Sequence, residues 1–426
     1  MNFKPYNSYK YSGIEWIGEI PEHWSAKKLK HVTDIIMGQS PNSSDINNEQ
    51  KGLLFMQGNA DFTDLYPNPS EYCTSPKKIS RVNDILMSVR APVGDLNLSD
   101  KRYGIGRGLC SIKAIKINLS YLWYYLIKSK IDFEYYSNGS TFDAVTIGNL
   151  LSFPILIPKL NEQKQIVNYL NKETSKIDET IGKNEELITL LKEKRVCLIN
   201  HVVTKGLNPD VPMKDSGIEW IGEIPDHWEY RKINTLSSVR RGASPRPIDD
   251  PIYFDDKGDY SWVRIADVTS SNKYLNKTDE KLSTLGKSLS VPIEPGNIFV
   301  SIAATVGKPI IANIKCCIHD GFVYFKNLSL NDEYLFYIFA GGEAYKGLGK
   351  LGTQLNLNTE TIGRIYVPVP PKHEQKQIIK YLDYEIDKLD NTISKIQENI
   401  SLLNEYKTSL INHVVTGKVD VRGEKI

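Results

Sequence analysis

Residues 12–24 read SGIEWIGEIPEHW and residues 216–228 read SGIEWIGEIPDHW, so 12 of 13 positions match. A second pair follows in each copy, where EQKQI at 162–166 recurs at 374–378. A third pair, LINHVVT, occupies 198–204 and 410–416. Matching segments in the same order at a long, nearly constant offset indicate a duplicated chain. The repeat is much longer than a solenoid unit, so it predicts two similar domains.

Composition limits the class of protein. The 426 residues exceed what one ordinary core accommodates, and 40% of them are hydrophobic, so buried cores are expected. The 53 Lys and Arg residues nearly balance the 51 Asp and Glu residues, which argues against binding of polyanions by bulk charge. The sequence contains no apolar run typical of a membrane span or a secretory signal. The five cysteines form no CxxC pair, which favours a protein of the reducing cytoplasm.

Each copy is predicted to end in one long helix. Apolar residues recur in steps of three and four from Leu170 to Val202, and again from Ile379 to Val414. This spacing is typical of a coiled coil. Polar residues that would fix the register of the coil interrupt the two seams at Thr174, Asn184, Arg195 and Lys407.

The helices are expected to pack on each other, because neither can expose an apolar seam alone, and an antiparallel pairing is favoured. The stretches before them contain strand-like runs such as ILMSV at 85–89 and IFVSI at 298–302. The predicted fold class is therefore α+β, with two similar mixed α/β domains joined by two long antiparallel coiled-coil helices and related by pseudo-two-fold symmetry. The expected ranges are 1–158 and 206–370 for the two domains, 159–205 and 371–417 for the helices, and 418–426 for a C-terminal tail.

In this order, the segments resemble the specificity (S) subunit of type I restriction-modification systems. The resemblance rests on the three repeated segments, on DILMSVRAPVG at 84–94 and NIFVSIAATVG at 297–307, and on GSTFDAV at 139–145 and GTQLNLN at 352–358. It covers essentially the whole chain. It implies that each mixed domain is a target recognition domain that reads one half of a bipartite double-stranded DNA sequence. It also implies that the helices set the spacer and dock two methyltransferase (modification) subunits, which motor/nuclease (restriction) subunits then join.

The resemblance assigns methylation and cleavage to those other subunits, and the residues agree. The text closest to a P-loop, KLSTLGKS at 281–288, has lysine where the first glycine should stand. The chain contains no NPPY-like tetrapeptide, and no glycine-rich dinucleotide loop follows a strand. Cys317 and His319 would share one face of a strand, but two ligands do not close a zinc site. We therefore expect no cofactor and no metal. Two rival functions stay open: a stand-alone DNA endonuclease and a duplicated scaffold that binds only proteins.

Readout of base sequence requires side chains that pair with base edges, such as Arg with guanine and Asn or Gln with adenine. Loops that align between the copies supply such residues, and positions that differ are expected to set specificity. The alignment places Gln57 opposite Val263, and Arg107 opposite Asp320. The candidate DNA-binding residues of the first copy are Gln39, Ser40, Gln57, Asn59, Arg90, Arg107, Ser140 and Thr141. Those of the second copy are Arg241, Ser244, Arg246, Arg264, His319, Lys350, Thr353, Gln354 and Asn356.

Overall fold

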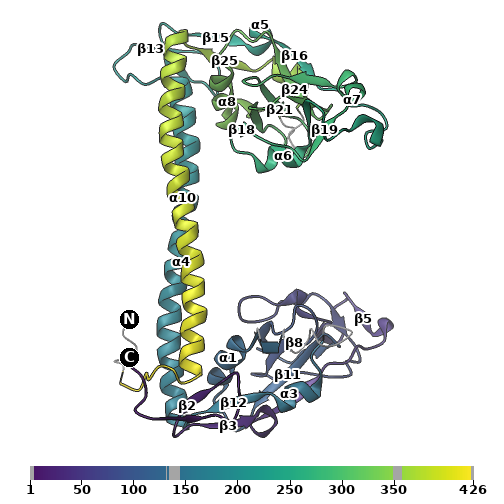
Figure 1. Cartoon of the computed structure of the whole chain (residues 1–426), viewed down its shortest axis with the longest axis vertical. Helices are drawn as coiled ribbons and strands as arrows, with labels where there is room; N and C mark the ends of the chain where they lie inside the picture. The colour runs from purple at the N-terminus through teal and green to yellow at the C-terminus, as the bar shows by residue number, and fades with distance from the viewer. Residues whose placement is uncertain (1–3, 131, 134–143, 349–356, 424–426) are drawn as a thin grey trace. The chain divides into compact units, whose positions relative to one another are not determined.

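The computed structural model describes residues 4–130, 132–133, 144–348 and 357–423. The chain divides into two compact units (Figure 1). Unit 1 comprises Met1–Asn184 together with Glu398–Ile426, and unit 2 comprises Glu185–Gln397. Each unit therefore combines a strand-rich head with one part of each long helix.

The head of unit 1 contains two four-stranded sheets, with strand orders β4-β11-β8-β9 and β10-β6-β7-β5. Two smaller antiparallel pairs, β1-β2 and β12-β3, complete it. Its strands are β1 (Tyr9–Tyr11), β2 (Glu19–Pro21), β3 (Ser25–Lys28), β4 (Thr33–Met37), β5 (Ile46–Asn47), β6 (Leu53–Met56), β7 (Tyr72–Cys73), β8 (Ile85–Ser88), β9 (Leu96–Leu98), β10 (Gly104–Ile105), β11 (Leu109–Ala114) and β12 (Pro154–Ile157). Its short helices are α1 (Leu119–Lys128) and α3 (Ile147–Ser152).

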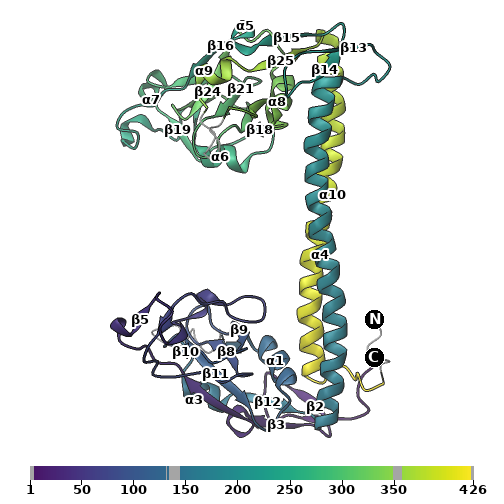
Figure 2. The same ribbon diagram turned by 180° about the vertical axis from the view of Figure 1, so that it is seen from behind.

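The head of unit 2 repeats this plan with a five-stranded sheet, β16-β24-β21-β22-β18, and a four-stranded sheet, β19-β17-β23-β20 (Figure 2). Its strands are β13 (Met213–Asp215), β14 (Glu223–Pro225), β15 (Glu229–Lys232), β16 (Ser238–Arg241), β17 (Tyr260–Val263), β18 (Tyr274–Leu275), β19 (Glu280–Leu282), β20 (Val291–Ile293), β21 (Ile298–Ser301), β22 (Pro309–Ala312), β23 (Cys316–Ile318), β24 (Phe322–Lys326) and β25 (Tyr366–Val369). Its short helices are α5 (Ile233–Leu236), α6 (Ile265–Ser270), α7 (Thr284–Ser288), α8 (Asp332–Ala340) and α9 (Thr359–Gly363). The strands predicted at 85–89 and 298–302 are confirmed as β8 and β21.

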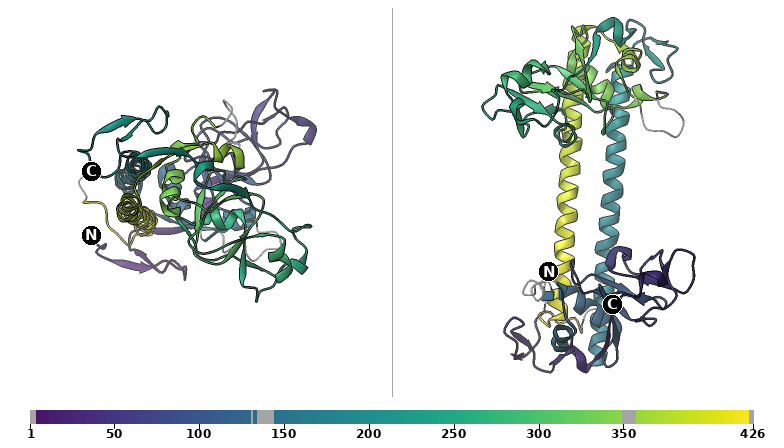
Figure 3. Two further views of the ribbon diagram at one scale, coloured as in Figure 1. Left: turned by 90° about the horizontal axis from the view of Figure 1, so that it is seen from above. Right: turned by 90° about the vertical axis from the view of Figure 1, so that its right-hand side faces the viewer.

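The two long helices are α4 (Leu160–Lys205) and α10 (Lys372–Val415). In unit 1 they run antiparallel and lie side by side (Figure 3): Asp178 pairs with Lys407 at 2.6 Å, and Glu162 lies 3.9 Å from Arg422. The partner number rises as the α4 number falls, as antiparallel packing requires. Lys407 is one of the polar residues predicted to fix the register of the seam.

The parts of α4 and α10 in unit 2 also run antiparallel. Arg195 lies 3.5 Å from Asp390, and Gly206, just after α4, lies against Trp228. The indole of Trp228 bonds to Glu374 in the first turn of α10. The end of α4 is thus close to the start of α10, which confirms the predicted pairing within this unit.

The coiled-coil seam is also confirmed by burial. The apolar seam residues are buried or half-buried along both helices, and Leu170, Leu382 and Val414 are among the most buried. A glycine in the left-handed region follows each helix, Gly206 directly after α4 and Gly417 two residues after α10, each with φ of +75°. Only glycine adopts this conformation without strain, so the helix ends are fixed by the sequence.

The repeated segments of unit 1 contact each other, which explains why they recur together. The carboxylate of Glu162 in α4 accepts hydrogen bonds from the hydroxyl of Tyr6 at 2.9 Å and from the indole of Trp24 at 3.0 Å. Nε2 of His23 lies 2.8 Å from the same carboxylate. Glu162 is 5% exposed, so this node is buried and joins the PEHW segment to the start of the helix.

Unit 2 contains the equivalent node. Glu374 accepts a hydrogen bond from Trp228 at 3.0 Å and lies 2.7 Å from Nε2 of His227. The glutamine that follows this glutamate in each EQKQI segment also contacts the head. The side chains of Gln163 and Gln375 accept from the backbone N–H of Asn118 and Asn331, the N-cap residues of α1 and α8. The EQ pair of each EQKQI motif therefore anchors its head to its long helix.

A tyrosine from each head reaches the end of a long helix. In unit 1 the hydroxyl of Tyr121 is shared between the carbonyls of Leu156, at 3.0 Å, and Val415, at 3.3 Å. In unit 2 the hydroxyl of Tyr334 donates to the carbonyl of Val203 at 2.8 Å. Unit 2 also contains an ion-pair network between its head and α10. Nζ of Lys273 lies 3.1 Å from Glu333 and 2.5 Å from Asp383 of α10. These contacts attach the strands that carry the candidate site to a helical support.

Candidate nucleic-acid interface

Three loops of unit 1 meet where β4, β6 and β10 end. The backbone N–H of Gln39, just after β4, donates to the carbonyl of Ile105 at 3.0 Å. The N–H of Gly108 donates to the carbonyl of Gln57 at 3.0 Å. A Cβ on Gly38 would lie 2.0 Å from the nearest backbone oxygen, so this close approach requires glycine.

The polar side chains of these loops lie together at the surface. Nε2 of Gln57 donates to Oγ of Ser40 at 2.8 Å, and both groups reach solvent. Arg107 is exposed between two buried glycines, and Arg90 is exposed just after β8. Neither guanidinium has an ion-pair partner among the described residues. Within the described residues, unit 1 therefore presents an amide held by Ser40 and two exposed arginines that form no ion pair.

Asn59 lies in the same region but is engaged within the protein. Its amide donates to Asp95 at 2.7 Å, and Asp95 also pairs with Lys130 at 2.5 Å. An amide held by a carboxylate in this way has fewer free groups for a base edge. Its predicted role in DNA binding stays a prediction.

The same backbone arrangement recurs in unit 2. The N–H of Ala243 donates to the carbonyl of Ile318 at 3.2 Å, as Gln39 does to Ile105 in unit 1. The N–H of Ile302 donates to Gly321 at 2.8 Å, as Val89 does to Gly108 at 2.9 Å in unit 1. These pairs fix the structural equivalences: Gly38 with Gly242, Ser40 with Ser244, Arg90 with Ala303, Gly106 with His319, and Arg107 with Asp320.

The equivalence reverses the charge at one position, because Asp320 replaces Arg107. Oγ of Ser244 donates to Asp320 at 2.8 Å, and Nη2 of Arg246 donates to the other carboxylate oxygen at 3.1 Å. The guanidinium of Arg241 donates to the backbone carbonyl of Asp320. The hydrogen bond from Ser244 and the nearby arginines hold the pKa of this carboxyl below its usual value. Asp320 thus gathers three of the predicted DNA-binding residues around itself.

Arg264 is paired within unit 2. Its guanidinium forms two hydrogen bonds to the carboxylate of Glu280, and Asp249 lies 3.9 Å away. The hydrogen bond to Glu280 raises the pKa of Arg264 further. Unlike Arg107, this arginine must leave or share a bidentate partner before it can contact a base.

His319, in the loop after β23, packs against two aromatic side chains. Its ring centroid lies 4.6 Å from that of Phe322 and 5.8 Å from that of Trp262. Nδ1 accepts a hydrogen bond from the N–H of Gly321 at 2.8 Å, so the neutral ring carries its proton on Nε2. Burial lowers the pKa of His319, and Asp320 opposes that shift only in part. The ring is therefore neutral near pH 7.

One predicted alignment is wrong by one residue. Gln57 was placed opposite Val263, but β6 pairs with β10 so that Met56 faces Ile105, and β17 pairs with β23 so that Val263 faces Ile318. Because Ile105 and Ile318 are equivalent, Gln57 corresponds to Arg264. The shared Ala-Asp dipeptide that follows had misled the alignment, since α6 begins one residue closer to its strand than the equivalent turn does.

Six predicted DNA-binding residues lie outside the described residues: Ser140, Thr141, Lys350, Thr353, Gln354 and Asn356. The others are brought together within their own units. The sequence reasoning omitted Asp320 and Glu280, which hold the arginines of unit 2. The reversal from Arg107 to Asp320 in the aligned loops was the signal that could have identified Asp320.

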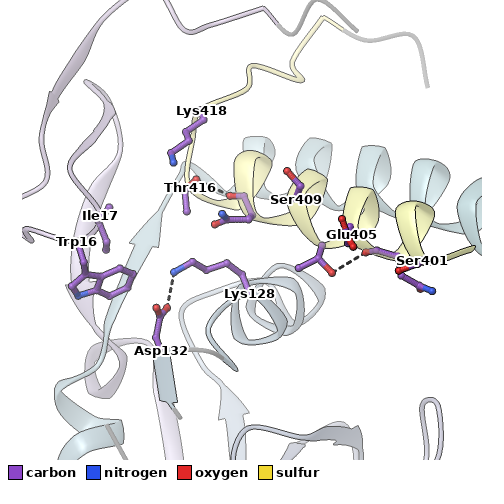
Figure 4. A pocket seen from close by; sticks show the side chains of 12 residues that line it. Trp16, Ile17, Lys128, Asp132, Ser401, Glu405, Ser409, Thr416 and Lys418 are labelled. Carbon is purple, nitrogen blue, oxygen red and sulfur yellow. Dashed lines mark hydrogen bonds and ion pairs between the residues drawn. The ribbon is translucent and has the colours of Figure 1, made fainter. Parts of the chain in front are cut away.

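A groove of about 770 Å³ in unit 1 lies between the loop after β1, helix α1 and the last turns of α10 (Figure 4). Lys128 extends into it between Asp132, at 2.6 Å, and the ring of Trp16, at 4.2 Å from the centroid. Burial lowers the pKa of Lys128. The α10 side is lined by serine, threonine and asparagine together with Glu405.

Among the described residues, no group of three or more His, Cys, Asp or Glu side chains is placed to hold a metal ion. Among the helices formed by the described residues, none combines the length and the apolar character needed to cross a membrane.

The two heads can be compared with known protein families. The family model of the type I restriction modification DNA specificity domain matches residues 21–189 and again residues 225–403. These two matches cover most of the chain, and the chain belongs to this family.

Individual relatives agree with this assignment. The putative type I restriction enzyme MjaX specificity subunit of Methanocaldococcus jannaschii is 43% identical over 187 residues, which are 43% of this chain and 44% of that protein. The MjaVIII specificity subunit of the same organism is 24% identical over 95% of this chain and 94% of that protein. The chain thus matches less than half of the first relative and nearly all of the second.

Two solved structures share the fold. One comes from a study of complex assembly and conformational transition of the type I R-M system, with 18% identity, a TM-score of 0.73, and coverage of 94% of this chain and 99% of that chain. The other is the HsdS subunit from Thermoanaerobacter tengcongensis, with 17% identity, a TM-score of 0.53, and coverage of 94% and 98%. The predicted α+β fold with long helices is confirmed.

Proposed function

We propose that this chain is the non-catalytic DNA-recognition subunit of a type I restriction-modification complex. Each head is a target recognition domain that binds one half of a bipartite double-stranded DNA site. The helices α4 and α10 set the unread gap and dock two methyltransferase subunits, and motor/nuclease subunits join the assembly. Such a complex acts on DNA in the cytoplasm.

The observation that supports this proposal most is the pair of equivalent loop clusters with unlike side chains. Gln57 in unit 1 corresponds to Arg264 in unit 2, and Arg107 corresponds to Asp320. A protein that reads a palindrome would need the same side chains in both heads, because each half-site would present the same base edges. Unlike side chains on a common backbone fit two different half-sites.

Exchange of one head tests the assignment. Residues 30–157 are replaced by the corresponding segment of another family member, and the chimera is assembled with its methyltransferase subunits. Methylated sites are then mapped on genomic DNA. We expect one half of the bipartite site to change while the other half and its base preferences stay the same. A change in both halves would contradict the assignment of one head to one half-site.

The rival functions have their own controls. Cleavage of duplex DNA by the purified chain with Mg²⁺ alone would support a stand-alone endonuclease. A complex that forms with methyltransferase subunits but shows no sequence preference would support a scaffold that binds only proteins. The proposed function requires sequence preference in the complex and no cleavage by the chain alone.

A further inference from the structure

Ser40 in unit 1 and Ser244 in unit 2 occupy equivalent positions, but their side chains have different hydrogen-bond partners. Ser40 and Ser244 each lie two residues after a glycine that packs against a neighbouring loop backbone. Each also precedes a proline, Pro41 or Pro245, which restricts the serine backbone to extended conformations. The hydroxyls are therefore held at equivalent places by backbone constraints.

In unit 1 the serine orients an amide. Ser40 Oγ accepts one N–H of Gln57 at 2.8 Å, and the same hydroxyl lies 3.3 Å from Gln57 Oε1. These two distances place Ser40 on the amide edge that carries Oε1 and the neighbouring N–H, so that edge is engaged within the protein. The second N–H of the amide faces away from Ser40 and can donate to a single acceptor, the N7 atom that both purines present in the major groove. The contact with Ser40 thus limits the rotations of the amide before DNA binds.

In unit 2 the serine acts through a carboxylate. Ser244 donates to one oxygen of Asp320, and Arg246 donates to the other. The side chain of Arg246 is 71% exposed, so most of its five N–H groups face solvent. A guanidinium fixed at one nitrogen retains donors for the O6 and N7 acceptors of guanine.

We propose that Ser40 and Ser244 are equivalent positioning residues, each orienting the side chain that reads one base of its half-site. In unit 1 that side chain is Gln57, which selects a purine through N7. In unit 2 it is Arg246, oriented through Asp320, which selects guanine. The shared serine and the divergent partner explain how one backbone supports two specificities. This inference rests on the proposed function and adds the residues and the base class.

The test uses the full chain assembled with its methyltransferase subunits and a library of duplexes randomised across the bipartite site. Binding is measured position by position at fixed salt. Gln57→Ala is expected to lower the preference for a purine at one position of one half-site by roughly 2- to 13-fold, the range of one hydrogen bond. Ser40→Ala is expected to relax that same position by a smaller factor. Gln57→Glu is expected to shift the preference there from purines towards cytosine, whose N4 amino group a carboxylate accepts.

The second unit supplies an independent set of variants. Arg246→Ala, Asp320→Asn and Ser244→Ala are expected to relax one guanine position in the other half-site and to leave the first half-site unchanged. Ser43→Ala is the matched control, because Ser43 is an exposed serine of the Ser40 loop. It should leave both profiles as in the wild type. Thermal unfolding of each variant shows that the fold is intact.

The outcomes separate the two levels of inference. If the wild-type complex shows no bipartite preference, the proposed function fails. If the wild type is specific but Ser40→Ala and Gln57→Ala affect different positions, or leave discrimination unchanged, the positioning role is overturned. A uniform loss of affinity across all sequences with a changed salt dependence would instead identify a phosphate contact and would also overturn it.

Discussion

Removal of the Glu162 carboxylate should destabilise unit 1 more than removal of Glu374 destabilises unit 2. Glu162 accepts hydrogen bonds from two buried donors, since Tyr6 is 4% exposed and Trp24 is fully buried. A buried donor without a partner costs about 1–3 kcal/mol, so Glu162→Ala should cost about 2–6 kcal/mol. Glu374 satisfies one fully buried donor, the indole of Trp228, and Glu374→Ala should cost about 1–3 kcal/mol.

The histidine that contacts each glutamate contributes little to the difference between these two costs. The side chains of His23 and His227 are 33% and 46% exposed, so water can replace the lost carboxylate at both. Hydrogen exchange measured by mass spectrometry reports the stability of each unit from its own peptides, which a single melting temperature of a two-unit chain does not. Glu162→Gln keeps an acceptor oxygen and should recover part of the loss. Equal costs at the two sites, or a loss in unit 1 that spreads to the peptides of unit 2, would refute this reasoning.

Three further outcomes are expected. Because burial lowers the folded pKa of His319, the unfolded chain binds more protons below about pH 6.5. Hydrogen exchange of peptides from unit 2 should therefore show that this unit loses stability as the pH falls through that value, and His319→Phe should flatten the profile. Lys273→Met should weaken the protection of α8 from hydrogen exchange by about 1–3 kcal/mol, because two neighbouring carboxylates lose their cation, and adding Asp383→Asn should recover part of it. Gly242→Ala places a Cβ 2.2 Å from a backbone oxygen, so methylation mapping should show loss of one half-site preference in a folded protein; unchanged methylation would contradict the close packing.

The long helices could be predicted because their signals are local and repeated. The heptad seam and the glycines at 206 and 417 are properties of neighbouring residues, and the structure confirms both. Packing of the two helices on each other followed from the need to cover two apolar seams. The ion pair of Lys407 with Asp178 agrees with the favoured antiparallel direction within unit 1. The division of the chain into recognition domains, spacer helices and tail stays a prediction.

The contacts of the candidate site could be predicted only in part. The alignment of Arg107 with Asp320 was correct, because both residues precede a glycine that the backbone arrangement requires. The alignment of Gln57 failed because a loop can shift by one residue without changing the strands beside it. The pairing of Arg264 with Glu280 depends on the β17–β19 register, in which Glu280 faces Trp262, two residues before Arg264. Such contacts between distant residues leave no periodic signal in one sequence.

Each unit completes its core with a helix segment from the other sequence repeat. Tyr121 of the first copy bonds to Val415 of the second, and Tyr334 of the second copy bonds to Val203 of the first. Neither repeat is therefore a self-sufficient folding module. A gene that encoded one repeat would produce a protomer that needs a second copy of itself to bury the apolar seam of its long helix. The present chain is equivalent to such a homodimer whose two protomers are fused into one polypeptide. Fusion lets mutations accumulate independently in the two halves, so that a once symmetric reader can evolve into an asymmetric one.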